Sequence, residues 1–301
     1  RADGATERPR GAGVAPASAA MSIALRHDEP AEPPIPPEGA RADAAAVWVL
    51  GSGSKGNAVV VAHAGRAILL DAGFELPELV GRLARVGLHP WHVDDVVLSH
   101  GHRDHVLGAA DGARAYGWRV WATLGTVWRW RDLREVPVRP FAPGDAFDAG
   151  AFRVRTAATP HDVDDSSALV VEAGAARVAY VTDLGEVPPA VEALLAGVHA
   201  LVLESNHDPD LLRDGPYPPE VRRRVAGPNR HLANAQAAAL LRAVAHPGLR
   251  HVVLGHISRH NNTPFLALAT ARAALAGTAF AGTLAAAAQD APLGPLVVRG
   301  G

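Results

Sequence analysis

The sequence predicts an α/β fold in which two mixed β-sheets pack together, with helices outside, in one domain. Three observations support this class. Apolar strands come first and form a hairpin, and later strands alternate with helices. Hydrophobic residues make up 48% of the 301 residues, which is enough for a sizeable core. The chain shows no internal repeat of fixed period.

The first half of the chain begins with strands. Residues 46–54 (AVWVLGSGS) predict a strand that runs into a Gly/Ser turn, and 57–65 with 66–73 predict the hairpin. Apolar spacing predicts a helix over 75–88, and a short buried strand follows at 94–100. Helices are expected over 105–117 and near 124–134, with a strand at 119–123 between them.

The second half continues the alternation. Strands are expected at 152–161, 167–174, 176–185, 200–206 and 251–258, and helices at 188–197, 234–245 and 263–277. Residues 283–299 predict two closing strands. Residues 1–44 are rich in Ala, Pro, Gly and charge without a sustained period, so we expect a disordered extension before a domain at 45–301.

Composition narrows the chemistry. The chain has no cysteine, which excludes disulfides, thiolate metal sites and thiol nucleophiles and leaves histidine and carboxylate as the strong transition-metal ligands. A net charge of −2 excludes a general polyanion binder, so any nucleic-acid contact requires a local basic patch. No run of 18 apolar residues occurs; we expect no membrane span and a cytoplasmic location.

Histidines and aspartates gather at the expected ends of strands. The stretch SHGHRDH (99–105) follows one strand, and single ligands follow three later ones. Such a set suits two metal ions that share a carboxylate and activate a hydroxide between them. The metals are zinc or manganese, with iron as a further alternative. The candidate ligands are His100, His102, Asp104, His105, His161, Asp183 and His256.

The pattern H-x-H-x-D-H, with the later His, Asp and His, resembles the metallo-β-lactamase fold family. That resemblance implies an αββα sandwich with a dinuclear site at one edge. It also implies the ligand sets: the first metal takes His100, His102 and His161, the second takes Asp104, His105 and His256, and Asp183 bridges them.

Three further stretches resemble the YycJ/WalJ-like branch of this family: GSGSKGNA (51–58), residues 203–234 and LGHISRHNNTP (254–264). The resemblance implies a phosphodiesterase, specifically a 5′-to-3′ DNA exonuclease. The chain departs from the branch at Ala233, where serine is expected, and at Pro219, where an aromatic residue is usual. Neither position is a metal ligand.

Five arginines precede a candidate catalytic histidine. Arginine matches phosphate oxygens, so the cluster fits a track for a nucleic-acid backbone, although a solvated helix face fits equally. Arg222 and Arg223 are the candidate substrate contacts; they cannot both point the same way on a helix. His231 is expected to give a proton to the leaving oxygen or to bind phosphate; the alternative is a capping or buried histidine. The arginines are Arg213, Arg222, Arg223, Arg224 and Arg230.

Other polar residues complete the expected site. Ser54 and Asn57 lie in a Gly-rich turn that can bind an anion, although a plain hairpin turn is equally expected, and Asn234 is expected to share the contact of His231. Glu204 and His207 are expected to orient ligand histidines, and Asn261 and Asn262 to fix a loop or touch substrate. Four tryptophans between 118 and 130 suit core packing better than base stacking.

The function predicted from these features is metal-dependent hydrolysis of nucleic acid, DNA in particular, with Asp104 and His231 as catalytic residues. One alternative is a small-molecule hydrolase acting on a thioester, lactone or cyclic phosphodiester. Such an enzyme needs a closed pocket rather than a basic groove. A second alternative is a non-catalytic binding module, which predicts broken ligand sets. The sequence leaves the oligomeric state open.

Overall fold

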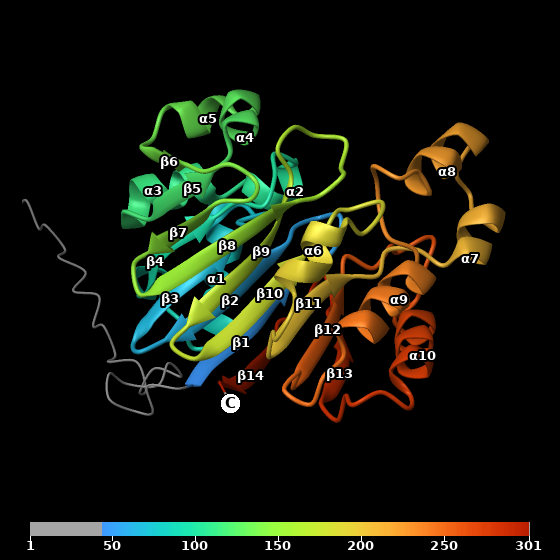
Figure 1. The fold of residues 1–301 in the computed structure, drawn as a ribbon. Coiled ribbons are helices and arrows are strands. Elements are labelled where there is room, and N and C mark those ends of the chain that lie inside the picture. The colour runs from blue at the N-terminus through green and yellow to red at the C-terminus, as the bar shows by residue number, and fades with distance from the viewer. Residues whose placement is uncertain (1–43, 301) are drawn as a thin grey trace, which may run out of the picture. The chain divides into compact units, whose positions relative to one another are not determined.

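Two seven-stranded sheets face each other in the computed structural model, which describes residues 44–300 (Figure 1). The extension expected at 1–44 lies outside the described residues, except for Ala44, which already belongs to the first strand. Helices flank both sheets, so the predicted sandwich of two mixed sheets is confirmed.

The first sheet has the strand order β14-β1-β2-β3-β4-β5-β6. Strands β3 to β6 run parallel, and the pairs β14–β1, β1–β2 and β2–β3 are antiparallel. Both closing strands predicted at 283–299 are present, one in each sheet. The bounds in this sheet are β1 (Ala44–Gly51), β2 (Ala58–His63), β3 (Arg66–Leu70), β4 (Val93–Val97), β5 (Arg119–Ala122), β6 (Val138–Pro140) and β14 (Leu293–Arg299).

The second sheet has the order β13-β12-β11-β10-β9-β8-β7. Strands β10 to β13 run parallel, and β7 to β10 pair in antiparallel fashion. The parallel strands of each sheet therefore present their carboxyl ends at one edge, where ligands bind in folds of this kind. The bounds are β7 (Ala146–Ala149), β8 (Phe152–Ala158), β9 (Ser167–Ala173), β10 (Ala176–Val181), β11 (Ala200–Glu204), β12 (His251–Gly255) and β13 (Thr283–Ala286).

Three hydrophobic layers hold the sandwich together. Strand β1 is a continuous apolar run because both of its faces are buried. Val47 and Val49 pack between the sheets, and Trp48 and Leu50 pack under the helices of the first sheet. A strand that is buried on both faces needs apolar residues at both alternating positions. The layer between the sheets also contains Tyr180, whose hydroxyl reaches the site described below.

Helices cover the outer faces unequally. Helices α1 (Leu76–Arg85) and α3 (Ala109–Tyr116) pack on the first sheet, and α6 (Pro189–Leu194), α9 (Asn234–Val244) and α10 (Pro264–Leu275) pack on the second. Helices α7 (Pro209–Asp214) and α8 (Pro219–Val225) stand out from the sandwich at the upper right of Figure 1. Residues 209–225 are called the arm below. A 3₁₀ turn lies at Pro90–His92.

Two predicted helices are broken in the structure. The helix expected over 105–117 is divided into α2 (Arg103–Val106) and α3 because Gly108 donates a backbone hydrogen bond to Ala72 and packs against the chain after β3. The helix expected near 124–134 is divided into α4 (Leu124–Arg129) and α5 (Arg131–Arg134) at Trp130, whose φ and ψ are −117° and 116°. Tertiary contacts override the local periodicity in both places.

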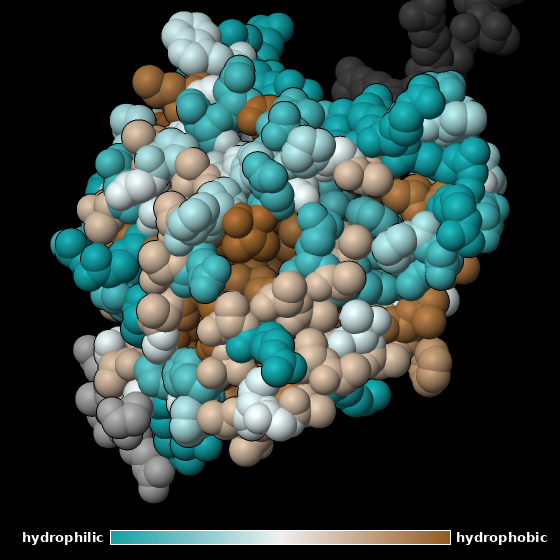
Figure 2. All heavy atoms as spheres, turned by 45° about the vertical axis from the view of Figure 1, so that its right-hand side comes forward, coloured by the Kyte–Doolittle hydropathy of each residue, from teal (hydrophilic) through white to brown (hydrophobic). Residues whose placement is uncertain are grey.

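The described surface shows no sign of a membrane span. No helix within residues 44–300 combines the length and the apolar character that crossing a bilayer requires. The face that Figure 2 brings forward mixes hydrophilic and hydrophobic residues, with a hydrophobic hollow near its centre.

Candidate metal centre

The predicted ligands meet at one edge of the sandwich. His100 and His102 follow β4, Asp104 and His105 lie on α2, and the remaining ligands follow β8, β10 and β12. Three residues of the site have backbone φ angles in the left-handed region: Asp71 (59°), Asp183 (54°) and His256 (50°). Non-glycine residues adopt this region at a cost, and such strain gathers at functional sites.

The first ligand set brings three imidazole nitrogens together. Nδ1 of His102 lies 3.1 Å from Nε2 of His100 and 3.0 Å from Nε2 of His161. Burial and the nearby His161 lower the pKa of His102 to about 4, and burial lowers the pKa of His100 well below its ordinary value. Neutral imidazoles are the form that binds a metal, and these three converge as ligands do.

The second set combines a carboxylate and two imidazoles. Oδ2 of Asp104 lies 3.5 Å from Nε2 of His105 and 3.6 Å from Nε2 of His256. The Nε2 atom of His256 is buried and has no hydrogen-bond partner among residues 44–300. A buried polar atom without a partner is costly, so this nitrogen fits a bound cation. The donor set of nitrogen and carboxylate oxygen suits a divalent transition metal.

Asp183 lies between the two sets. Its Oδ2 is 3.1 Å from Nε2 of His105, and its Oδ1 is 3.9 Å from Nε2 of His161. Burial alone would raise the pKa of this carboxyl, but His256 and His105 hold it well below its usual range. The ionised carboxylate faces both sets, as the resemblance implies for a bridging ligand, and this role stays a prediction.

Asp71, which the sequence analysis missed, supports His105. Its Oδ2 accepts from Nδ1 of His105 at 2.6 Å, from the Ser99 hydroxyl at 2.8 Å and from the Tyr180 hydroxyl at 2.9 Å. The carboxylate therefore holds one ring nitrogen of His105 protonated and turns the other toward the cluster, a common arrangement around metals. The signal was available, because Asp71 directly follows an apolar strand, as Asp183 does.

Glu204 joins two histidines. Its Oε1 accepts from Nδ1 of His231 at 2.8 Å and from Nδ1 of His256 at 3.0 Å. Burial lowers the pKa of His231, but Glu204 and Asp183 outweigh it and raise that pKa to about 9. These four residues also lie close enough to hold a metal ion. We assign Glu204 to orienting His256, because its bond to Nδ1 leaves the buried Nε2 for the second ligand set.

Backbone contacts bring the chain close around the centre. A Cβ atom on Gly73 would lie 1.7 Å from the Asp104 carbonyl oxygen, so only glycine lets this segment pack against α2. Nδ1 of His161 lies 3.1 Å from the Arg230 carbonyl oxygen, which fixes that ring. The Asn206 amide donates to the His256 carbonyl at 2.8 Å.

Two predicted substrate residues are buried below the site. Asn57 is 1% exposed, and its Nδ2 lies 3.3 Å from Oδ2 of Asp104. Asn234 is 3% exposed and accepts from Ser205 at 2.7 Å and from Asn262 at 2.8 Å. Because neither side chain reaches solvent, a positioning role suits both better than substrate contact, and their roles stay predictions. His207 is also buried, and its Nδ1 has no hydrogen-bond partner among residues 44–300.

The other predicted substrate residues are on the surface. Ser54 is exposed at the tip of its turn, and Arg223 is exposed on α8, where Arg222 is half-buried. Arg213 is paired with Asp210 and Asp214. Arg230 is paired with Asp162. Of the five arginines of this cluster, those without an ion pair among residues 44–300 are therefore the three of α8: Arg222, Arg223 and Arg224.

The tryptophans divide between core and surface. Trp118 and Trp121 are buried, which agrees with packing. Trp130 donates from its indole to the carbonyl oxygen of Gly101, between two ligand histidines, at 2.8 Å. Trp128 is 70% exposed on α4.

Known proteins share both the sequence pattern and the fold. Residues 66–257 match the family model of the beta-lactamase superfamily domain. The chain is 30% identical over 224 residues to exodeoxyribonuclease YycJ of Bacillus anthracis, and 27% identical over 231 residues to exodeoxyribonuclease WalJ of Streptococcus pneumoniae. Each match covers 73% of this chain and 84% of the relative.

A solved structure repeats the fold. The metallo-beta-lactamase fold protein YhfI of Bacillus subtilis superposes with a TM-score of 0.64 at 16% identity, over 83% of this chain and 99% of that one. The family model spans well over half of this chain, and the relatives match it along most of their length. The protein therefore belongs to the beta-lactamase superfamily, in the branch that resembles YycJ and WalJ, and is a metal-dependent hydrolase of the metallo-β-lactamase fold.

Proposed function

We propose that this protein is a phosphodiesterase that uses two divalent metal ions to hydrolyse nucleic acid, specifically a 5′-to-3′ DNA exonuclease. The observation that carries the proposal is the pair of ligand sets around Asp183, together with an arm whose helix α8 carries three arginines that have no ion pair among residues 44–300. The relatives named as exodeoxyribonucleases favour DNA as the substrate. The 5′-to-3′ direction is the one that the sequence resemblance implies.

The ligand sets fit two ions, with His100, His102 and His161 for one and Asp104, His105 and His256 for the other. Bound there, divalent metals supply Lewis-acid chemistry: they offset charge on phosphoryl oxygens and acidify a coordinated water. Zinc and manganese both accept this mixture of imidazole and carboxylate, and iron is a further alternative.

His231 supplies the proton in this proposal. Its Nδ1 donates to Glu204 at 2.8 Å, which leaves Nε2 to face the reacting group. The raised pKa, about 9, keeps the ring protonated at neutral pH. A protonated imidazole beside the ligand sets is suited to give its proton to the leaving oxygen of a phosphodiester.

The arm offers a path for a strand of nucleic acid. No side chain of α8 is buried, and its three consecutive arginines have one acidic neighbour on that helix, Glu220. An unpaired guanidinium binds phosphate through a planar pair of donors. Such contacts position a nucleic acid without reading its sequence, as an exonuclease requires.

The test is hydrolysis of DNA by the purified protein loaded with Mn²⁺ or Zn²⁺. Oligonucleotides labelled at the 5′ or the 3′ end, single- and double-stranded, report product size and direction. The His102→Ala variant is the control, with bound metal measured for both proteins; we expect it to lose at least about a thousandfold in rate. Intact DNA with every metal, despite full metal occupancy, contradicts the proposal and directs attention to thioesters, lactones and cyclic phosphodiesters.

A further inference from the structure

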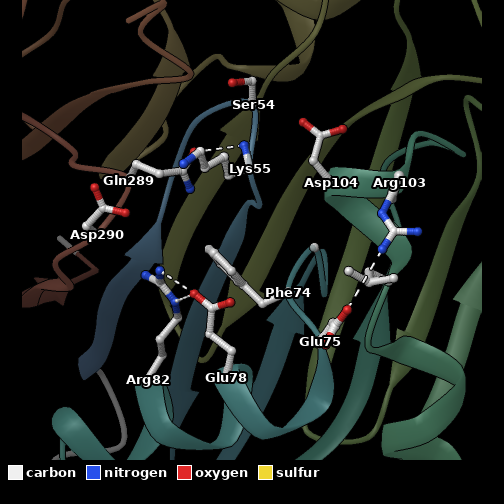
Figure 3. A pocket seen from close by; sticks show the side chains of 12 residues that line it. Ser54, Lys55, Phe74, Glu75, Glu78, Arg82, Arg103, Asp104, Gln289 and Asp290 are labelled. Atoms are coloured by element: carbon white, nitrogen blue, oxygen red, sulfur yellow. Dashed lines mark hydrogen bonds and ion pairs between the residues drawn. The ribbon is translucent and has the colours of Figure 1, made fainter.

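A pocket of about 510 Å³ opens beside the metal ligand Asp104. Figure 3 shows its lining from four separate segments: the turn after β1, the chain from Phe74 into α1, helix α2, and Gln289 with Asp290 before β14. Ser54 and Asp104 lie in the upper part of this view, Phe74 lies near its centre, and Arg82 and Glu78 lie in the lower part. A group bound in the pocket would therefore adjoin the metal centre.

The turn after β1 connects the pocket to the ligands. The Ser52 hydroxyl accepts from the His256 backbone N–H at 2.8 Å and donates to Oδ1 of Asn57 at 3.1 Å. The Asn57 amide reaches Asp104, as described above. Gln289 holds the tip, because it accepts from the Lys55 backbone N–H and donates to the Gly56 carbonyl, both at 2.8 Å. The Lys55 side chain is thus carried by a turn fixed to the metal centre.

Each charged side chain that lines the pocket has a partner, except one. The Asp104 carboxylate belongs to the second ligand set, with His105 and His256. Arg82 pairs with Glu78 at 2.8 Å and stacks on Phe74. Arg103 lies 3.9 Å from Glu75. The carboxylate of Asp290 pairs with an arginine outside the pocket, Arg259, at 2.7 Å. The exposed ammonium of Lys55 has no ion pair among residues 44–300 and is left as the uncompensated cation of the pocket.

This lysine is also exceptional in the sequence. Lys and Arg together number 29, and Lys55 is the only lysine, so the other 28 cations are arginines. The chain uses arginine at every other cationic position, on helix faces and strand edges alike. An ammonium is a compact point charge with three rotatable donors, whereas a guanidinium is a broad planar fork. A compact ammonium suits a single phosphate group that is held beside bound metals.

We propose that Lys55 binds a phosphate group of the substrate strand next to the one that is cleaved, so that this pocket is a phosphate subsite. The inference rests on the proposed function and names which group of the nucleic acid the pocket receives. Two sources supply this chemistry: the phosphomonoester at the end of a strand and the next internal phosphodiester. In both cases the ammonium donates to phosphate oxygens while the strand adjoins Asp104.

The test compares Lys55→Ala and Lys55→Arg with wild type and with Arg272→Ala, which removes an exposed cation from α10, outside the pocket. Binding of single-stranded oligonucleotides is measured across a salt series. We expect Lys55→Ala to weaken binding about tenfold at low salt and to reduce the slope of log Kd against log salt by about 0.7, the value for one phosphate contact. The Kd of Lys55→Arg should lie between those of wild type and Lys55→Ala, and the Kd of Arg272→Ala should match that of wild type.

The end group of the oligonucleotide separates the two sources. A loss confined to 5′-phosphorylated strands assigns the pocket to the terminal phosphate. An equal loss with 5′-hydroxyl strands assigns it to the internal phosphodiester. Because Lys55 is the only lysine, acetylation of its amine, followed by mass spectrometry of its peptide, gives an independent measurement, and bound DNA should slow that reaction about tenfold.

Two results overturn the subsite. Either Lys55→Ala binds and cleaves DNA as wild type does, or DNA leaves the acetylation rate of Lys55 unchanged. Each differs from failure of the proposed function. If the proposed function fails, the wild-type protein itself neither binds nor cleaves DNA, and both proposals are contradicted together.

Discussion

The metal centre and the arm differ in how the fold holds them. The centre lies at strand ends between two sheets. Five of its seven candidate ligands are buried, His102 and Asp104 are half-buried, and hydrogen bonds to Asp71 and Glu204 hold His105 and His256. The arm stands away from the sandwich, and its helix α8 buries no residue. The three arginines of α8 have no ion pair among residues 44–300, and Arg222 donates to the backbone carbonyl of Arg213. The buried region fixes the geometry of a reaction, and the exposed region can change partners at little cost to the fold.

His231 lies between these two regions in the chain, which makes it the sharpest test of the comparison. We expect His231→Gln to lower kcat for DNA about a hundredfold, because general acid catalysis is lost. On a p-nitrophenyl phosphodiester, whose leaving group needs no proton, the loss should shrink to severalfold. The control is His246→Gln, at a half-buried histidine that bonds the Val198 carbonyl far along the second sheet. Equal losses on both substrates would assign His231 to the structure of the centre instead.

Asp71 tests whether the buried region depends on its outer hydrogen bonds. Asp71→Asn keeps the shape but removes the charge that holds Nδ1 of His105 protonated. We expect metal affinity, measured by competition with a chelator, to fall about tenfold or more. Asp95→Asn is the matched control, since Asp95 is an equally buried aspartate that bonds Arg119 and Trp121 away from the ligands. Equal metal affinity in both variants would argue against a role for Asp71 at the centre.

The arm contains its own control for phosphate binding. Arg223→Ala removes an exposed cation without an ion pair in the described chain, whereas Arg213→Ala removes one that two aspartates already neutralise. We expect Arg223→Ala to raise KM for DNA about threefold at low salt, an effect that higher salt abolishes, with kcat unchanged. Arg213→Ala should leave KM unchanged. A fall in kcat for Arg223→Ala would show that the arm acts on the chemical step.

The smallest expected effect is the pH dependence of the free energy of unfolding of the metal-free protein. The folded pKa of His102 is about 4, so its contribution is present above pH 6.5 and is lost as the pH falls toward 4. The folded pKa of His231 is about 9, so its contribution is present below pH 6.5 and is lost as the pH rises through 9. The free energy of unfolding, measured with urea in the presence of a chelator, should therefore be highest near pH 6.5. In His231→Gln the decline on the alkaline side should be shallower; an unchanged profile would exclude His231 as its source.

Much of the buried region was predictable because its residues follow strands. Apolar runs located the strands, and the histidines and aspartates just beyond them had to gather at one edge once those strands lay side by side. Asp71 also follows a strand, but its role depends on Ser99, His105 and Tyr180, which only the tertiary structure brings to it. Asn57 and Asn234 were expected to meet substrate because a polar residue in a turn or at the start of a helix resembles a contact residue, and only packing shows that both are buried.

The sequence alone determined the fold class, the metal-binding character of the chain and the identity of the seven candidate ligands. Those features depend on local periodicity and on which side chains can bind a cation at all. Tertiary structure decided the rest. It broke two helices where Gly108 and Trp130 meet other segments, placed Glu204 between two histidines, and left Lys55 without a counterion at the mouth of a pocket. Each of these depends on residues distant in the chain, whose approach is set by the packing of two sheets and not by any local preference.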